Sequence, residues 1–385
     1  MTIWIHFSRY SYQASHKQDL PILDYQPIED VERLERYRPG GYCPMLVGDI
    51  LQNRYKVVHK LGHGTFSTVW LAHDRLQESY VAVKVSTAGS PSPEADCYVT
   101  SPARSSVSAA KFLSLFNIES ARAIASQLVL AVAYIHSRGI VHDIHLGNVL
   151  LRLPSSLSQL STEELYTQFD NPQSEPIISL DGKALPPGVP PYGTAPVWLS
   201  KRAKDISPGD AHILLSDFGP AFSPSKPSQT RIGEQCYAPL PVHPPEAYFQ
   251  PEKPISFASD IWTLACAIWS LFSSRPLLDG MLATLEDIAV QQVDILGSLP
   301  AEWWSGDWTA RSEYFDASGR PCGGRYVYPS LEECFEVNEA FLAMVRRMFV
   351  LRPDERATAV EVLECAWIRH WELPTFVGMD EADGV

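Results

Sequence analysis

The sequence has few cysteines and lacks any C-x-x-C pair. Its seven cysteines are odd in number and scattered along the chain, at Cys43, Cys97, Cys236, Cys266, Cys322, Cys334 and Cys365. A disulfide framework needs cysteines in pairs, and a structural zinc site needs closely spaced ligands, so this pattern argues against both. It favours a protein of a reducing compartment.

The sequence also lacks a long apolar run and an excess of positive charge. No segment approaches the roughly 20 apolar residues that cross a membrane, so we expect no membrane partner. There are 31 basic residues against 45 acidic ones, which gives a formal charge of −14. This balance argues against direct nucleic-acid binding and would suit a basic peptide partner, although solubility alone would also account for it.

A chain of 385 residues, 45% of them apolar, is too long for one ordinary core, so we expect two lobes flanked by tails. A polar insert with nine prolines is predicted to be mostly loop or disorder. We predict an N-terminal tail over 1–45, a small lobe over 46–105, a large lobe over 106–370 that contains the insert at 154–210, and a C-terminal tail over 371–385.

Two polar side chains five residues apart lie in the segment VHDIHLGNVLL, residues 141–151. In phosphoryl transfer an Asp accepts the proton of the attacking hydroxyl, and an Asn a short loop away holds a magnesium ion. Asp143 and Asn148 have this D-x-x-x-x-N spacing. Both residue types are common in loops, so the pattern gains meaning only from the motifs on either side of it.

A glycine-rich hairpin precedes this segment. The chain alternates as the strands RYKVVHKLG, STVWLAHD and YVAVKV, with Gly62 and Gly64 between the first two. Glycines remove Cβ atoms where backbone amides must approach phosphates, although such a hairpin can also be an ordinary turn. Ser67 stands where G-x-G-x-x-G would have its third glycine. Alternation puts Ala82 and Lys84 on one face beneath the hairpin, and a strand lysine needs an anion unless it reaches solvent.

A short apolar strand after the insert delivers the tripeptide Asp217-Phe218-Gly219. An acid at a strand end followed by Phe-Gly supplies a second magnesium ligand with a hinge behind it. The tripeptide alone occurs often by chance. After two earlier motifs in the appropriate order, chance becomes a poor explanation.

The rest of the chain is predicted to be mainly helical. Apolar side chains keep helical spacing over 109–138, and helices dominate 257–370. This part also holds the motifs P-P-E, S-D-I-W and R-P-D-E-R, which contain Glu246, Asp260 and Arg356.

With these motifs in this order, the chain resembles the eukaryotic protein kinase superfamily over roughly residues 50–370. More narrowly it resembles the SR-protein kinase family, especially its fungal branch. The segments behind this are GGYCPMLVGDILQNRYKVVHKLGHGTFSTVWLAHD, the VHxxHLGNVLL loop, SDIWTLACAIW and LEDIAVQQVDILGSLPAEWW. The resemblance implies a bilobal α+β fold, with a small β-rich lobe and a large helical lobe, and a serine/threonine protein kinase that uses ATP and Mg²⁺.

The resemblance also implies roles for individual residues. Lys84 would pair the α- and β-phosphates, Asp143 would be the catalytic base, and His145 would stand beside the γ-phosphate. Asn148 and Asp217 would hold magnesium. The nucleotide would be bound by the hairpin and strand residues Leu61, Gly62, His63, Gly64, Thr65, Phe66, Ser67, Val69, Ala82 and Lys84.

Four further residues would support the site. Glu94 would pair with the strand lysine, and Asp260 would brace the catalytic loop from its helix. Glu246 and Arg356 would form the structural ion pair of the large lobe.

Family substrates are Arg-Ser-rich proteins, which implies a regulator of mRNA splicing that is found in the cytoplasm and nucleus and acts as a monomer. The acidic balance of the chain suits such a basic docking peptide. Four acids lie in the segment where the family builds its docking groove, although a solvated helix face explains them equally: Glu286, Asp287, Asp294 and Glu302.

The sequence departs from the family pattern at three points. The catalytic loop is one residue short, so His142 abuts Asp143, and Pro220 follows the Phe-Gly hinge. Only the 22 residues 86–107 stand where a regulatory helix, two strands and a hinge need about 35. The segment CYVT resembles the hinge strand, so the missing part would precede Cys97 and the small sheet would lack inner strands.

Two other hypotheses therefore remain beside an active protein kinase. The short small lobe favours a pseudokinase that binds partners without catalysis. The loop V-H-x-D-[IL]-H-x-G-N also resembles that of aminoglycoside and choline kinases, which phosphorylate small molecules, although those families usually lack the later P-P-E and R-P-D-E-R motifs.

Overall fold

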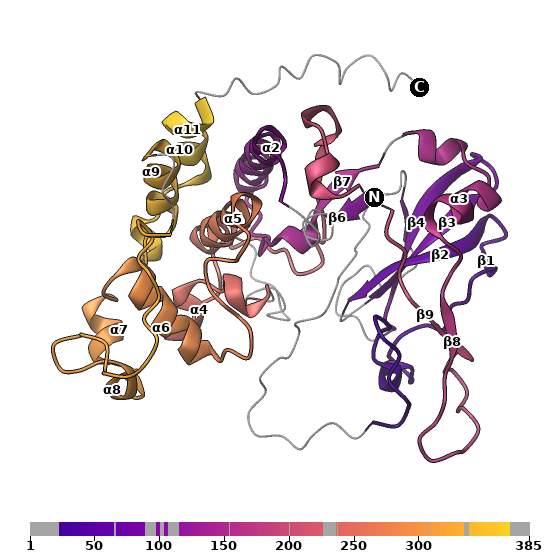
Figure 1. Ribbon diagram of the computed structural model, residues 1–385, viewed down its shortest axis with the longest axis horizontal. Helices are drawn as coiled ribbons and strands as arrows, with labels where there is room; N and C mark the ends of the chain where they lie inside the picture. The colour runs from indigo at the N-terminus through magenta and orange to yellow at the C-terminus, as the bar shows by residue number, and fades with distance from the viewer. Residues whose placement is uncertain are drawn as a thin grey trace. The chain divides into compact units, whose positions relative to one another are not determined.

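The computed structural model describes residues 23–64, 67–88, 98–100, 104–106, 115–153, 155–199, 201–225, 236, 238–306, 308–334 and 339–369. The chain divides into two compact units (Figure 1). Unit 1 is Met1–Asn117 with Leu146–Gly219, and unit 2 is Ile118–His145 with Pro220–Val385. Unit 1 is rich in strands and unit 2 is mainly helical, which is the predicted α+β architecture.

Unit 1 is built on an antiparallel sheet with the strand order β1-β2-β3-β4-β5. Its strands are β1 (Ile50–Leu51), β2 (Tyr55–Gly64), β3 (Ser67–Asp74), β4 (Ser79–Ser86) and β5 (Tyr98–Thr100). Alternate side chains of a strand point to opposite faces. In β3, Val69 and Leu71 join one hydrophobic cluster, and Trp70 and Ala72 join another. The apolar run VWLA thus reflects a sheet that is buried on both faces.

The short strand β5 pairs directly with β4, with Tyr98 opposite Lys84 and Val99 opposite Val83. The expectation that the small sheet would lack inner strands is therefore wrong for the part of the sheet that the structure describes. Strand β5, which is part of the CYVT segment, therefore lies next to β4, which contains Lys84, and the antiparallel pairing continues from β4 to β5.

Most of the insert over 154–210 lies outside helices and strands, as predicted, but its described part packs against the sheet instead of being disordered. Its elements are η3 (Ser155–Gln159), α3 (Thr162–Phe169), β8 (Ser174–Pro176), β9 (Tyr192–Thr194), η4 (Ala203–Asp205) and η5 (Pro208–Asp210). Helix α3 starts with a capping box between Ser161 and Glu164. Four apolar side chains of the insert enter the same cluster as Val69: Leu157, Leu165, Val197 and Leu199.

The chain before residue 46 is also part of unit 1, so its description as a tail is wrong from residue 23 onward; residues 1–22 lie outside the described residues. Tyr25, Leu34, Tyr37 and Tyr42 form a hydrophobic cluster with Ile177 of the insert. The short helix η1 (Leu34–Arg36) lies within this segment. The partners come from the distant insert, which is why local sequence patterns did not reveal them.

A second, three-stranded sheet in unit 1 joins β6 (Arg104–Ser106), β7 (Val149–Arg152) and β10 (Ile213–Leu215) in the order β10-β7-β6. The strands β7 and β10 are antiparallel, with Leu214 opposite Leu150. Leu150 packs in the same cluster as the insert and β3. Residues 146–219 therefore belong with the strand-rich unit, although the sequence suggested the large lobe for them.

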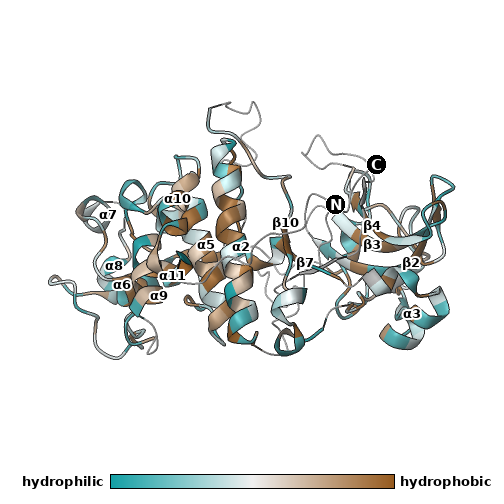
Figure 2. Cartoon of the chain, turned by 90° about the horizontal axis from the view of Figure 1, so that it is seen from above, coloured by the Kyte–Doolittle hydropathy of each residue, from teal (hydrophilic) through white to brown (hydrophobic). Residues whose placement is uncertain are grey.

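Unit 2 is organised around α2 (Ile118–Ser137) and α5 (Phe257–Phe272), which contact one another and lie side by side in Figure 2. By length and composition α2 could cross a membrane, but 61% of its apolar window is buried inside the unit, as in the core helix of a globular protein. The other helices are η6 (Leu240–Val242), α4 (Pro245–Phe249), α6 (Leu285–Leu296), α7 (Ala301–Ser305), α8 (Arg311–Tyr314), α9 (Glu339–Met348), η7 (Pro353–Glu355), α10 (Ala359–Leu363) and α11 (Ala366–Arg369).

Candidate active site

The glycine-rich hairpin joins β2 to β3 in unit 1. Gly62 lies opposite Val69 and Gly64 opposite Ser67, and Thr65 and Phe66 lie outside the described residues. A Cβ atom built on Gly64 would meet no other atom within 4 Å. The hairpin therefore borders open space, as a loop that admits a ligand to its backbone must.

The apolar residues expected to hold the nucleotide lie beneath this hairpin. Leu61, Val69 and Ala82 are all 0% exposed. They pack in one cluster with Leu150 of β7 and with the apolar side chains of the insert. A nucleotide base could reach them only if these side chains moved apart.

Lys84 of β4 forms an ion pair with Asp217, with 3.2 Å between Nζ and Oδ1. Both side chains are partly exposed, at 16% and 24%. Asp217 follows β10 and has a φ of +63°, a left-handed conformation that is costly for residues other than glycine. Glu94, the predicted partner of this lysine, lies outside the described residues.

Asn148 is held next to Asp217 by the pairing of β7 with β10. It ends the short helix η2 (Leu146–Asn148), and the backbone N–H and the hydroxyl of Ser216 both donate to its carbonyl oxygen at 2.8 Å. Its side-chain Oδ1 is buried and has no hydrogen-bond partner among the described residues. Amide and carboxylate oxygens are ligands that Mg²⁺ prefers, so the chemistry of Asn148 and Asp217 fits the ion.

The predicted catalytic base, Asp143, belongs to unit 2 and has a φ of +67°. Its backbone N–H donates to Oδ1 of Asp260 at 2.7 Å, and that of His142 donates to Oδ2 at 2.9 Å. The ring of His136 lies 3.0 Å from the same Oδ2. Asp260 is fully buried in α5. A buried carboxylate thus holds the backbone of the loop in a strained conformation.

The carboxylate of Asp143 accepts two hydrogen bonds from the chain ahead of α4. The N–H of Ala238 donates to Oδ2 at 2.8 Å, and the thiol of Cys236 donates to Oδ1 at 3.3 Å. Burial, followed by the negative charge of Asp143, raises the pKa of the Cys236 thiol well above its usual value. Sequence reasoning missed this contact, because 93 residues separate its partners and no motif contains the cysteine.

The residues around the shortened loop differ in burial and in backbone contacts. His142 is buried, and the backbone of Val141 forms a β-bridge with Phe222. His145 is partly exposed at the end of the loop. In unit 1, Phe218 is 42% exposed.

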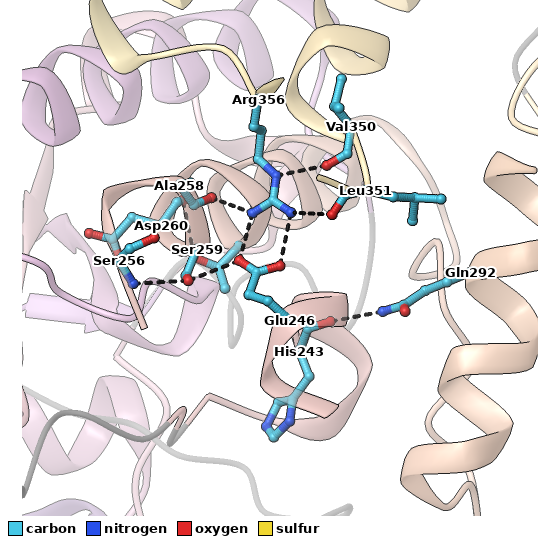
Figure 3. A network of polar contacts seen from close by, with 11 residues as sticks. His243, Glu246, Ser256, Ala258, Ser259, Asp260, Gln292, Val350, Leu351 and Arg356 are labelled. Carbon is cyan, nitrogen blue, oxygen red and sulfur yellow. Dashed lines mark hydrogen bonds and ion pairs between the residues drawn. The ribbon is translucent and has the colours of Figure 1, made fainter. Parts of the chain in front are cut away.

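Glu246 and Arg356 form a buried ion pair in unit 2 (Figure 3). The guanidinium donates from Nη1 to Oε1 of Glu246 at 2.8 Å and from Nη2 to Oε2 at 2.9 Å. Arg356 also donates to the carbonyl oxygens of Ala258, Val350 and Leu351. One arginine therefore joins α4, the start of α5 and the chain after α9.

Two of the four acids proposed for peptide docking are bound by the chain's own arginines. Asp294 is buried and pairs with Arg325 at 2.6 and 2.7 Å, and Glu302 pairs with Arg352 at 2.6 and 2.8 Å. Their interpretation as a solvated helix face does not hold for Asp294, which is 1% exposed.

The other two acids lie in the first turn of α6. Asp287 caps the helix with Thr284, and Glu286 accepts a hydrogen bond from Tyr248 at 3.3 Å. Both keep partial exposure. Glu302 is more exposed but is paired with Arg352, so among the described residues Glu286 and Asp287 are the acids of this segment without an arginine partner.

Comparison with known proteins gives similarity over nearly the whole chain. A serine/threonine protein kinase of Aspergillus fumigatus is 26% identical, over 96% of this chain and 99% of its own length. The alignment runs over 436 positions, whereas 96% of this chain is about 370 residues, so the relative has about 66 positions without a counterpart here.

Other relatives match a short stretch only. SRSF protein kinase 3 of Homo sapiens is 49% identical over 57 residues, which are 15% of this chain and 10% of that kinase. The serine/threonine-protein kinase spk-1 of Caenorhabditis elegans is 47% identical over 57 residues, or 6% of its length. The chain therefore matches only a small fraction of the length of these kinases.

No protein-family model matches the chain. Among solved structures, a kinase domain that is 17% identical covers 85% of this chain and 98% of its own, with a TM-score of 0.58. This likeness establishes the fold. Over nearly its whole length the sequence is also similar to a serine/threonine protein kinase, which agrees with this kinase-like fold.

Proposed function

We propose that the chain transfers the γ-phosphate of ATP to serine and threonine residues of Arg-Ser-rich proteins. The observation that carries the proposal is the Lys84–Asp217 ion pair, together with the buried, unpartnered Oδ1 of Asn148, a residue whose backbone carbonyl accepts from Ser216 next to Asp217. A cation and two oxygen donors in one place are what a magnesium-bound triphosphate requires. The conformation of Asp143 supports it further, since strained backbone is concentrated at functional sites.

Each residue has a task in this reaction. Asp143 accepts the proton of the substrate hydroxyl, and the hydrogen bonds from Ala238 and Cys236 orient its carboxylate. Lys84 binds phosphate oxygens, and His145 donates a hydrogen bond to the transferred group. Asn148 and Asp217 hold Mg²⁺, which neutralises the charge of the triphosphate.

The hairpin supplies the remaining phosphate contacts. Its backbone amides at Gly62, Gly64 and Ser67 would bind phosphate oxygens, and the open space at Gly64 supports this role. In the sequence, four residues stand between Asp143 and Asn148, the spacing of the D-x-x-x-x-N motif.

The substrate class rests on charge and on local similarity. The net charge of −14 favours basic peptides, and the accessible acids Glu286 and Asp287 offer partners for arginine. The local similarity to SRSF protein kinase 3 supports the same class. Such a kinase would regulate mRNA splicing as a monomer in the cytoplasm and nucleus.

Phosphorylation of matched peptides tests the substrate class. The wild-type chain is given ATP, Mg²⁺ and either an Arg-Ser-repeat peptide or a Lys-Ser peptide of equal charge. We expect a lower KM for the arginine peptide, and a rise in that KM in Glu286→Gln/Asp287→Asn. Equal KM values for the two peptides would refute the Arg-Ser assignment while leaving kinase activity intact.

A second candidate is a pseudokinase that binds partners without phosphate transfer. The specific observation in its favour is the complete burial of Leu61, Val69 and Ala82 among insert side chains. Calorimetric titration with ADP and Mg²⁺ separates the candidates. Binding at micromolar concentration would show that the cluster opens for a nucleotide, and no binding to folded protein would favour the pseudokinase.

A further inference from the structure

The hairpin that would cover the phosphates is held from outside the sheet by the chain before residue 46. The hydroxyl of Tyr42 donates a hydrogen bond of 2.6 Å to the carbonyl oxygen of Gly64. Twenty-two residues separate the two partners. Gly64 is the last residue of β2, so the contact is made at the tip of the strand.

A tight turn sets the position of Tyr42. Its backbone N–H and that of Gly41 donate to the carbonyl oxygens of Arg36 and Arg38, at 3.0 and 2.7 Å. A Cβ atom on Gly41 would lie 1.9 Å from the carbonyl oxygen of Arg36, which no rearrangement of a side chain could relieve. This turn therefore needs glycine at position 41.

A buried ion pair anchors the same segment to β2. Lys60, four residues before Gly64, pairs with Glu32, and the hydroxyl of Tyr37 also donates to that carboxylate. Burial alone would raise the pKa of Glu32, but the charge of Lys60 holds it below its usual value. A buried pair resists separation, because either charge alone would lose its partner without regaining water.

The insert closes the arrangement from the other side. The N–H of Val197 donates to the carbonyl oxygen of Lys60 at 2.8 Å, and Ile177 packs against Tyr37 and Tyr42. Chain segments outside the sheet thus bind strand β2 at two residues, Lys60 and Gly64. These contacts reduce the conformational freedom that glycine would otherwise give the backbone at this end of the strand.

We propose that residues 25–42 form a brace for the phosphate-binding hairpin, with Tyr42 as its positioning residue. The inference rests on the proposed function, because the hairpin needs positioning only if it binds phosphates. A fixed carbonyl at Gly64 lowers the entropy that the hairpin loses when it closes on a ligand, which strengthens binding without adding a contact.

The variant Tyr42→Phe removes only the hydroxyl. The hydroxyl also meets the side chain of Arg36, whereas the contact with the hairpin is the neutral hydrogen bond to Gly64, which corresponds to roughly a 3- to 10-fold effect. We expect the dissociation constant for ADP with Mg²⁺, and the KM for ATP, to rise by this factor, with kcat changed less than about 2-fold. Backbone amides over 61–69 should exchange hydrogen faster in the variant without nucleotide.

Tyr166→Phe is the matched control. The Tyr166 hydroxyl donates to the carbonyl oxygen of Val58 at 2.8 Å, also on β2 but away from the hairpin. We expect it to leave ADP affinity and the exchange over 61–69 unchanged. Equal effects of the two variants would overturn the proposal, since Tyr42 would then act as any stabilising hydroxyl.

Failure of the brace and failure of the proposed function give different results. A wild-type chain that is folded but binds no nucleotide contradicts the proposed function, and the brace is then tested by hydrogen exchange alone. Unchanged exchange over 61–69 in Tyr42→Phe overturns the brace even if ATP binds normally.

Discussion

Replacement of Arg356 should lower the stability of unit 2 more than replacement of any other charged residue in that unit. The guanidinium is 0% exposed and satisfies both carboxylate oxygens of Glu246. Its distances to the carbonyl oxygens of Ala258, Val350 and Leu351 are 2.6, 2.9 and 3.3 Å (Figure 3). Arg356→Met keeps much of the volume but leaves the carboxylate of Glu246 buried with only the hydroxyl of a neighbouring serine, 3.0 Å away.

Loss of one partner of a buried ion pair costs about 3–5 kcal/mol. For a unit of this size each kcal/mol lowers the midpoint of thermal unfolding by about 2–4 °C, so the expected fall is roughly 6–20 °C. Tryptophan fluorescence reports the transition, because most tryptophans lie in the range of unit 2 and Trp262 is 5.2 Å from the guanidinium.

Arg346→Met is the control, because Arg346 pairs with Glu332 at the surface, where both side chains are half exposed. Exposed pairs contribute about 0–1 kcal/mol. The double variant Glu246→Gln/Arg356→Met should recover part of the stability, as expected for residues that interact directly. If Arg356→Met and Arg346→Met lowered the midpoint equally, the buried network would not be what joins α4 to α5.

Four shorter predictions follow from the same geometry. Gly64→Ala should leave thermal stability unchanged, because a Cβ there meets no atom, but should raise the KM for ATP; equal KM values would show that phosphates do not approach this residue. Asp260→Asn should lower unit 2 stability by about 1–3 kcal/mol, measured by urea unfolding, because the N–H groups of His142 and Asp143 lose a charged acceptor. Iodoacetamide should label Cys236 slowly and label it faster in Asp143→Asn, with Cys322 as the internal reference in mass spectrometry, because the carboxylate raises the thiol pKa. Burial lowers the pKa of His59 from 6.5 to about 4, so the unfolded state takes up a proton first as pH falls; unit 1 should lose up to about 3 kcal/mol between pH 6.5 and 4, and His59→Phe should flatten that slope.

The parts of the fold that the sequence predicted are those with local signals. The apolar runs of β2, β3 and β4 and the helical spacing of α2 depend on neighbouring residues, and each pattern marks buried faces directly. The helix over 109–138 is observed as Ile118–Ser137. The N-terminal part of the predicted range lies outside the described residues.

The parts that the sequence did not predict depend on distant partners. The segment that begins at residue 23 packs against Ile177 of the insert. Its Glu32 forms an ion pair with Lys60, 28 positions further along the chain. No periodic pattern marks such pairs, because each side chain is buried by a separate loop. The prolines of the insert indicated mostly loop or disorder; it is mostly loop, and the sequence did not reveal the apolar side chains that pack it against the sheet.

The candidate site also contains residues that local motifs reveal and contacts that only the folded chain reveals. Motif spacing identified Lys84, Asp143, Asn148 and Asp217 because their chemistry is encoded locally. The roles assigned to them remain predictions. The thiol that donates to Asp143 could be found only from the folded chain.

Phosphate transfer from labelled ATP with Mg²⁺ to an Arg-Ser-repeat peptide tests the central claim most directly. The wild-type chain is compared with Asp143→Asn, which keeps the size of the side chain but removes the base, at equal helical content and equal thermal midpoint. The account predicts transfer by the wild-type chain that is lost in the variant. No transfer from well-folded wild-type protein, or equal transfer by both, would contradict it.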